Sequence, residues 1–153
     1  EFYAIDSALL DSLPKYKTPK GKVVYGGGGI VPDVFIPVDS AGSSLLLNQL
    51  FYEGIFNEFC FRYVDDHRKA LNQYKSIEAF AKKFNITDGI LDELTLFAQQ
   101  RGIIVSAREM NQSKTRIKRR VKSSIANYLW QDKGLFYILS EDDSDIQKVL
   151  EDF

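Results

Sequence analysis

The residue pattern of this 153-residue chain changes near residue 40, and this change constrains the fold more than any other feature. Before it, β-branched residues are interspersed with Pro and Gly, which favours short strands and turns. After it, large apolar residues recur at helical spacing with few breakers. We therefore predict an α+β, mostly α chain. A small β-hairpin and extended head, residues 1–40, should precede an all-helical bundle, residues 41–153.

The head contains one clear hairpin signal. Two short β-runs flank Pro19-Lys20-Gly21, where Pro fixes φ and Gly permits the chain to reverse. Further along, Pro32 and Pro37 exclude the run 34–38 from the middle of a sheet, so we expect an edge strand or a connector there. Because a two-stranded hairpin is marginal alone, we expect this one to join strands outside the head.

Interruptions of the apolar pattern predict where the helices of the body begin and end. Ser and Thr are favoured N-caps, and Gly commonly follows a helix. The last segment, 144–153, has the spacing of a short amphipathic helix. The predicted helix starts are Ser43, Ser76, Thr87 and Ser113, and the predicted break and stop are Gly54 and Gly102.

The composition excludes several classes of partner. With 20 Lys and Arg residues against 21 Asp and Glu residues, the net charge of -1 gives no global attraction to nucleic acid or anionic lipid. No run approaches the roughly 18 apolar residues of a membrane helix. We therefore expect no nucleic-acid partner and no membrane span. The chain begins with Glu1-Phe2 rather than Met, from which we expect a piece of a longer polypeptide or a processed form.

Each apparent catalytic pattern has a better structural explanation. The Gly26–Gly29 tract lacks the Lys and Ser/Thr that close a phosphate loop. The one cysteine, Cys60, lies in an aromatic run and is predicted to be a buried, inert thiol. The only histidine, His67, lies in a charged stretch and is predicted to be solvated. The sequence therefore predicts no catalytic, cofactor-binding or metal-binding residue, and no cofactor.

Basic residues cluster between positions 114 and 122. An amphipathic helix with the apolar stripe Ile117, Val121 and Ile125 would place them on its polar face. Two interpretations remain open: pairing with the acidic stretches 92–93 or 141–145, or a patch for an anionic partner. The candidate patch residues are Lys118, Arg119, Arg120 and Lys122.

Residues 15–39 resemble the end of the peptidase domain in carboxy-terminal-processing (tail-specific) serine peptidases, in the form typical of the Bacteroidetes branch. The resemblance rests on two strings, Thr18-Pro19-Lys20-Gly21-Lys22 and Gly29-Ile30-Val31-Pro32-Asp33. The helical body resembles the C-terminal extension of that branch, as in residues 61–64 and 124–126. The motif residues, to which we assign structural roles, are Thr18, Pro19, Gly21, Gly29, Ile30, Pro32 and Asp33.

The resemblance implies a parent enzyme with a Ser nucleophile and a Lys general base, together with a PDZ domain that binds substrate C-termini. These elements would lie upstream, so no catalytic residue is assigned here. The expected function is that of a non-catalytic C-terminal fragment of an exported serine endopeptidase, located in the periplasm or cell envelope. Its partners would be the upstream peptidase and PDZ domains and, through the parent, protein substrates.

The role of the helical domain stays open between gating, dimerisation (a homodimer) and capping of the sheet. The alternative function is a stand-alone helical interaction module, which binds a protein partner or an anionic surface through its basic helix.

Overall fold

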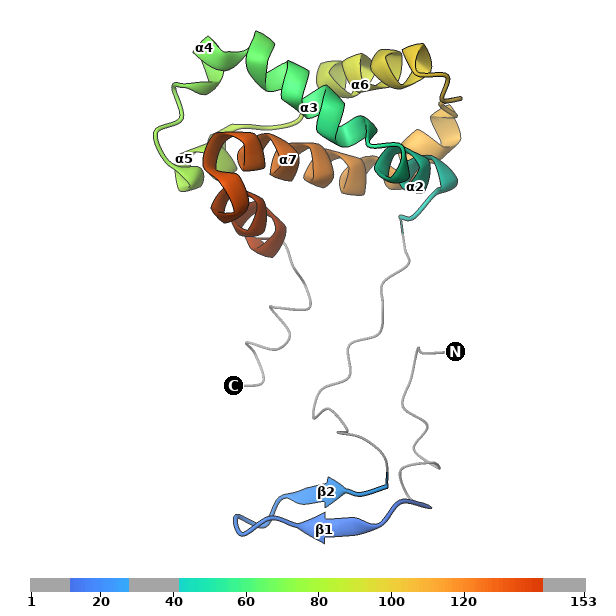
Figure 1. Ribbon diagram of the computed structural model, residues 1–153, viewed down its shortest axis with the longest axis vertical. Coiled ribbons are helices and arrows are strands. Elements are labelled where there is room, and N and C mark those ends of the chain that lie inside the picture. Colours follow the sequence, from blue (N-terminus) through green and yellow to red (C-terminus); the bar gives the residue numbers. More distant parts are fainter. Residues whose placement is uncertain (1–11, 28–41, 142–153) are drawn as a thin grey trace. The chain divides into compact units, whose positions relative to one another are not determined.

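The computed structural model describes residues 12–27 and 42–141, which form a hairpin and a helical unit (Figure 1). The predicted α+β, mostly α fold class is confirmed. The hairpin consists of β1 (Lys15–Lys17) and β2 (Val23–Tyr25). Several predictions fall outside the described residues: the motif positions Gly29, Ile30, Pro32 and Asp33, the run 34–38 and the terminal helix 144–153.

The hairpin forms where the Pro-Lys-Gly signal predicted it. β1 and β2 pair antiparallel, with Tyr16 opposite Val24. The turn is closed by two backbone hydrogen bonds of 2.8 Å, from Thr18 N to the Lys22 carbonyl and from Gly21 N to the Thr18 carbonyl. Lys22 N also donates to the Thr18 hydroxyl at 3.1 Å. Gly21 has a φ of 85°, a conformation that glycine adopts without steric cost.

Six helices make up the helical unit, and α7 is its longest element (Figure 1). Helices α2, α3 and α5 all pack against α7, and α6 packs against α3. The bounds are α2 Leu45–Tyr52, α3 Ile55–Asp66, α4 Arg68–Leu71, α5 Ile77–Lys83, α6 Asp88–Gln100 and α7 Ala107–Glu141.

Four of the predicted helix boundaries are confirmed. Ser76 and Thr87 are N-caps whose side-chain oxygens accept hydrogen bonds from the backbone N–H three residues later, at 3.2 and 3.3 Å. Gly54, with a φ of 69°, separates α2 from α3, and Gly102, with a φ of 82°, follows the end of α6. Local chemistry therefore determines these helix ends.

The predicted helix start at Ser113 is wrong. Helix α7 begins at Ala107, and Ser113 is buried within it. The Ser113 hydroxyl donates to Ser44 Oγ at 2.7 Å, and Ser44 in turn caps α2 by accepting from Leu47 N. Ser113 is thus a buried polar residue whose hydrogen-bond partner is the N-cap of α2. Its own preference for the N-cap position does not determine where α7 begins.

Helix α7 also continues beyond the predicted apolar stripe. Ile117, Val121 and Ile125 are fully buried, as predicted. The helix then kinks at Trp130 and Gln131, where Gln131 has a φ of 57°. Residues 135–139, which follow this kink, are also helical.

Cys60 is the buried thiol that the sequence predicted. Its side chain is fully buried, with Sγ 3.7 Å from the Val121 carbonyl oxygen. Burial raises the pKa of the Cys60 thiol to about 12. Because the thiolate is the nucleophilic form, a thiol that stays protonated at neutral pH is a core residue and not a reactive one.

Candidate functional site

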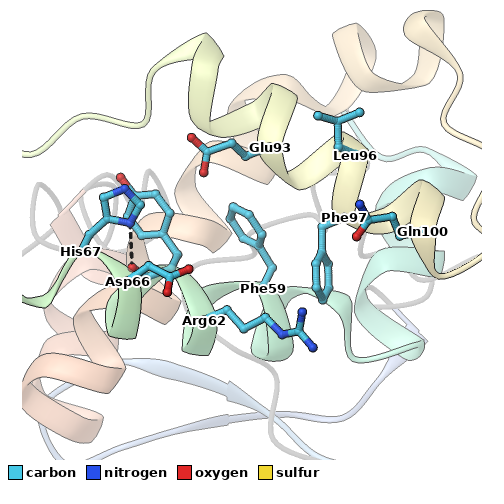
Figure 2. A pocket seen from close by; sticks show the side chains of 9 residues that line it. Phe59, Arg62, Asp66, His67, Glu93, Leu96, Phe97 and Gln100 are labelled. Atoms are coloured by element: carbon cyan, nitrogen blue, oxygen red, sulfur yellow. Dashed lines mark hydrogen bonds between the residues drawn. The ribbon is translucent and has the colours of Figure 1, made fainter.

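A shallow cleft of about 270 Å³ lies between α3 and α6, and aromatic side chains form much of its wall (Figure 2). Phe59 and Tyr63 lie one helical turn apart on α3, and Phe59 meets Phe97 of α6. The ring centroid of Phe59 lies 5.9 Å from that of Tyr63 and 5.9 Å from that of Phe97. Phe59 and Phe97 also belong to the hydrophobic core, so the packing of the helical unit fixes the wall of the cleft.

The cationic side chain of the cleft wall is already engaged. The Arg62 guanidinium lies over the Phe97 ring, 5.3 Å from its centroid, and 3.4 Å from the Glu58 carboxylate. Arg101 makes the same pair of contacts, with the Phe97 ring at 5.2 Å and with Glu58. Glu58 therefore offsets positive charge at this end of the cleft.

Two carboxylates of the cleft differ from Glu58 in having no such contact. Asp66 from α3 and Glu93 from α6 line the cleft from opposite walls, and both side chains are exposed (Figure 2). Among residues 12–27 and 42–141, neither carboxylate has an ion pair or a hydrogen-bond partner. Burial, followed by the negative charge of Glu93, raises the pKa of the Tyr63 phenol.

His67 lies at the same end of the cleft, where α3 ends. It is exposed, as the sequence predicted. Its ring stacks on Tyr63 with a centroid distance of 4.1 Å and an interplanar angle of 19°. Its Nδ1 is 2.9 Å from the Tyr63 carbonyl oxygen, so Nδ1 carries the proton and donates it. The ring is therefore held in place by its own helix.

The four side chains of the candidate anionic-partner patch are engaged in contacts that the sequence did not reveal. All four of its side chains are half-buried, and each contacts a group of the helical unit. Lys118 Nζ lies 2.9 Å from Asp88 Oδ1, Arg119 donates to the Leu139 carbonyl, Arg120 lies over the Phe51 ring at 5.0 Å, and Lys122 Nζ donates to the Ala81 carbonyl at 2.5 Å.

The expected pairing of this basic stretch with 92–93 is wrong, whereas residues 142–145 of the other expected acidic stretch lie outside the described residues. Within the described part of the chain, the carboxylate that pairs with it is Asp88, in the first turn of α6. Asp88 accepts from both Lys118 and Lys114, at 2.9 and 3.0 Å. These hydrogen bonds hold the pKa of Asp88 below its usual range. Lysine side chains of α7 thus tie α6 to α7.

Two classes of site are not found in the part of the chain that the structure describes. Within 12–27 and 42–141, no helix is both long enough and apolar enough to span a membrane. The same residues contain no group of three or more His, Cys, Asp or Glu side chains arranged to hold a metal ion.

The helical unit is thus a small helical domain with an aromatic-walled cleft between two of its helices. Residues 46–132 match a family of unknown function (DUF8443), and because this match covers more than half of the chain, the chain belongs to that family. The matched segment runs from α2 into α7 and includes both walls of the cleft. No curated protein and no solved structure matches the chain.

Proposed function

We propose that this chain is the non-catalytic C-terminal part of an exported serine endopeptidase that cleaves proteins near their C-termini. The observation that carries the proposal is the turn of the hairpin. Thr18 both donates to and accepts from Lys22, and Gly21 adopts the positive φ that the reversal needs. The Thr-Pro-Lys-Gly-Lys string through which the chain resembles tail-specific peptidases therefore has a defined structural role.

The apolar surface of the hairpin supports the same proposal. Tyr16 is 60% exposed and Val24, its partner across the strands, is 40% exposed. The strands β1 and β2 each have only three residues, too little for independent stability. Three or more strands with an apolar face are needed before such a sheet is stable. The hairpin would complete the sheet of an upstream peptidase domain, which would cover these side chains.

In this proposal, the helical unit contacts protein segments and takes no part in the cleavage reaction. It has a continuous core of its own, so it can present a surface without support from the hairpin. Its surface includes the cleft between α3 and α6. The alternative of anionic-surface binding through Lys118, Arg119, Arg120 and Lys122 has less support, because each of these side chains already has a contact within the unit.

The proposal predicts that further polypeptide precedes Glu1 in the native protein, and this can be tested. Intact mass and peptide sequencing of the protein isolated from its source cells should reveal a contiguous peptidase domain with a Ser and a Lys in the tail-specific motifs, and a PDZ domain. The protein should be found in the periplasmic or envelope fraction. A native polypeptide whose upstream part lacks the Ser or the Lys would overturn the assignment.

A further inference from the structure

We infer that two copies of this chain form a dimer by exchanging the segment of α7 that follows the kink, residues 132–141. In this dimer each α7 runs straight through the kink, and its last segment packs on the α7 of the other copy. The inference goes beyond the proposed function, because it rests on α7 alone and does not depend on what precedes the chain. It combines the backbone strain at the kink, the residue types there and the placement of the contacts that the segment makes.

The backbone is strained where α7 changes direction (Figure 1). Gln131 has a φ of 57° and a ψ of -151°, a combination that is close to the region occupied almost only by glycine. Trp130, with a φ of -133° and a ψ of 15°, is also non-helical. A straight α7 would return both residues to helical values and relieve the strain.

The residue types at the kink permit a straight helix. The residues from Leu129 to Lys133 include neither Pro nor Gly, so nothing in the covalent chain stops the helix there. Residues on both sides of the kink are already helical, and only the short hinge has to change. A short hinge under strain is the feature that favours the exchange of segments between copies.

The contacts of the segment are placed so that a second copy can restore them. Gly134 lies against the Ala126 carbonyl, and the Leu139 carbonyl accepts a hydrogen bond from Arg119. Both pairs are centred on residues 129 and 130, at the kink itself. Two straight α7 helices that cross at this point about a two-fold axis therefore remake both contacts between the copies.

A straight α7 cannot keep these contacts within one chain. Arg119 and Leu139 are 20 residues apart, which corresponds to about 30 Å along a helix. Ile138, which is buried against the helical unit, would likewise be withdrawn from its own copy. The straight form is therefore stable only when a second copy supplies the missing contacts, so its population should rise with protein concentration.

Refolding of the full 153-residue chain from urea at increasing protein concentration tests the inference, with the mass measured by size-exclusion chromatography and light scattering. We expect a dimer whose fraction rises with concentration. Gln131→Gly accepts the positive φ without steric cost and disfavours a helix, whereas Gln131→Ala does the opposite. Because the dimer contains two hinges, its association constant should be about tenfold or more higher for Gln131→Ala than for Gln131→Gly.

The matched control is Lys133→Gly, which introduces glycine at an exposed position that is helical in both forms. Its association constant should equal that of the unchanged chain. The inference is overturned if the unchanged chain stays monomeric at every concentration, or if the two Gln131 variants dimerise equally.

Spin labels distinguish the exchanged dimer from a dimer formed through the surface. Thr115→Cys/Glu141→Cys places labels at two exposed positions, and the native Cys60 is fully buried. Labelled chain is refolded with an excess of unlabelled chain, so that only distances within one chain are measured. We expect the dimer to show roughly 39 Å, the length of a straight helix between these positions, and the monomer to show a shorter distance. The same short distance in both fractions would identify a surface dimer and overturn the inference.

Discussion

Replacing Phe80 by alanine should lower the free energy of unfolding of the helical unit by about 3–5 kcal/mol. Phe80 is fully buried at the contact of α5 with α7. Its ring stacks on Phe84 at 4.6 Å and meets the edges of Tyr74 and Trp130, both at 5.4 Å. Truncation removes all of these contacts and leaves a cavity. Urea unfolding followed by circular dichroism measures the loss.

Phe136→Ala is the matched control for Phe80→Ala. Phe136 is the same residue type on α7, but its side chain is 64% exposed. Its truncation should change the free energy of unfolding by no more than about 0.5 kcal/mol, as is usual for surface positions. If the two variants lost equal stability, the assignment of Phe80 to the core would be wrong.

Replacing Gly134 by alanine should destabilise the helical unit by about 1–3 kcal/mol or more, the range for overpacking against groups that cannot move aside. A Cβ at this position would collide with the carbonyl oxygen of Ala126 and lie 2.8 Å from its carbonyl carbon. It would also lie 3.2 Å from Trp130 Cβ. Only glycine therefore lets the chain after the kink pack against the preceding part of α7.

The segment of α7 that follows the kink makes contacts of its own. Ile138 is buried, and Arg119 donates to the Leu139 carbonyl. We expect Gly134→Ala to weaken both, so that thermal unfolding begins at a lower temperature. The comparison variant is Gly89→Ala in the first turn of α6, where the new Cβ would make only an ordinary 3.6 Å contact. Glycine disfavours a helix, so this change should be neutral or stabilising, by up to about 1 kcal/mol. Two variants with equal losses would contradict the close packing at Gly134.

The parts of the fold that depend on local chemistry could be predicted from the sequence. The hairpin turn, the N-caps Ser76 and Thr87, and the glycines 54 and 102 each act on the backbone within a few residues. The helical period likewise placed Ile117, Val121 and Ile125 in the core. Such signals are readable in one sequence because the interacting groups are neighbours along the chain.

The predictions that failed concern residues whose interaction partners are remote in sequence. Serine is favoured at helix N-caps, but the hydroxyl of Ser113 donates instead to Ser44, the N-cap of α2. No proline marks the kink of α7 in the sequence. Gln131 has its positive φ where the chain after the kink packs close to Ala126. The pairing of Lys114 and Lys118 with Asp88 depends on how α6 lies against α7, which the sequence of either helix does not reveal.

The cleft was missed for the same reason. Helical spacing of apolar residues indicates core positions for Phe59 and Phe97, and the charged stretch around His67 indicates a solvated segment. Each assignment is correct locally. The cleft arises only because α3 packs against α6, which brings Asp66 and Glu93 to opposite walls of one aromatic surface (Figure 2).

The assignment to an exported serine endopeptidase is tested most directly by a cleavage assay on two forms of the protein. The full native polypeptide and the 153-residue chain are each incubated with an unfolded protein substrate that has a free C-terminus, and the products are identified by mass spectrometry. We predict cleavage near the C-terminus by the full polypeptide, loss of cleavage when its upstream Ser is replaced by Ala, and no cleavage by the 153-residue chain. Cleavage by the 153-residue chain, or a folded full polypeptide that cleaves no substrate, would contradict the assignment.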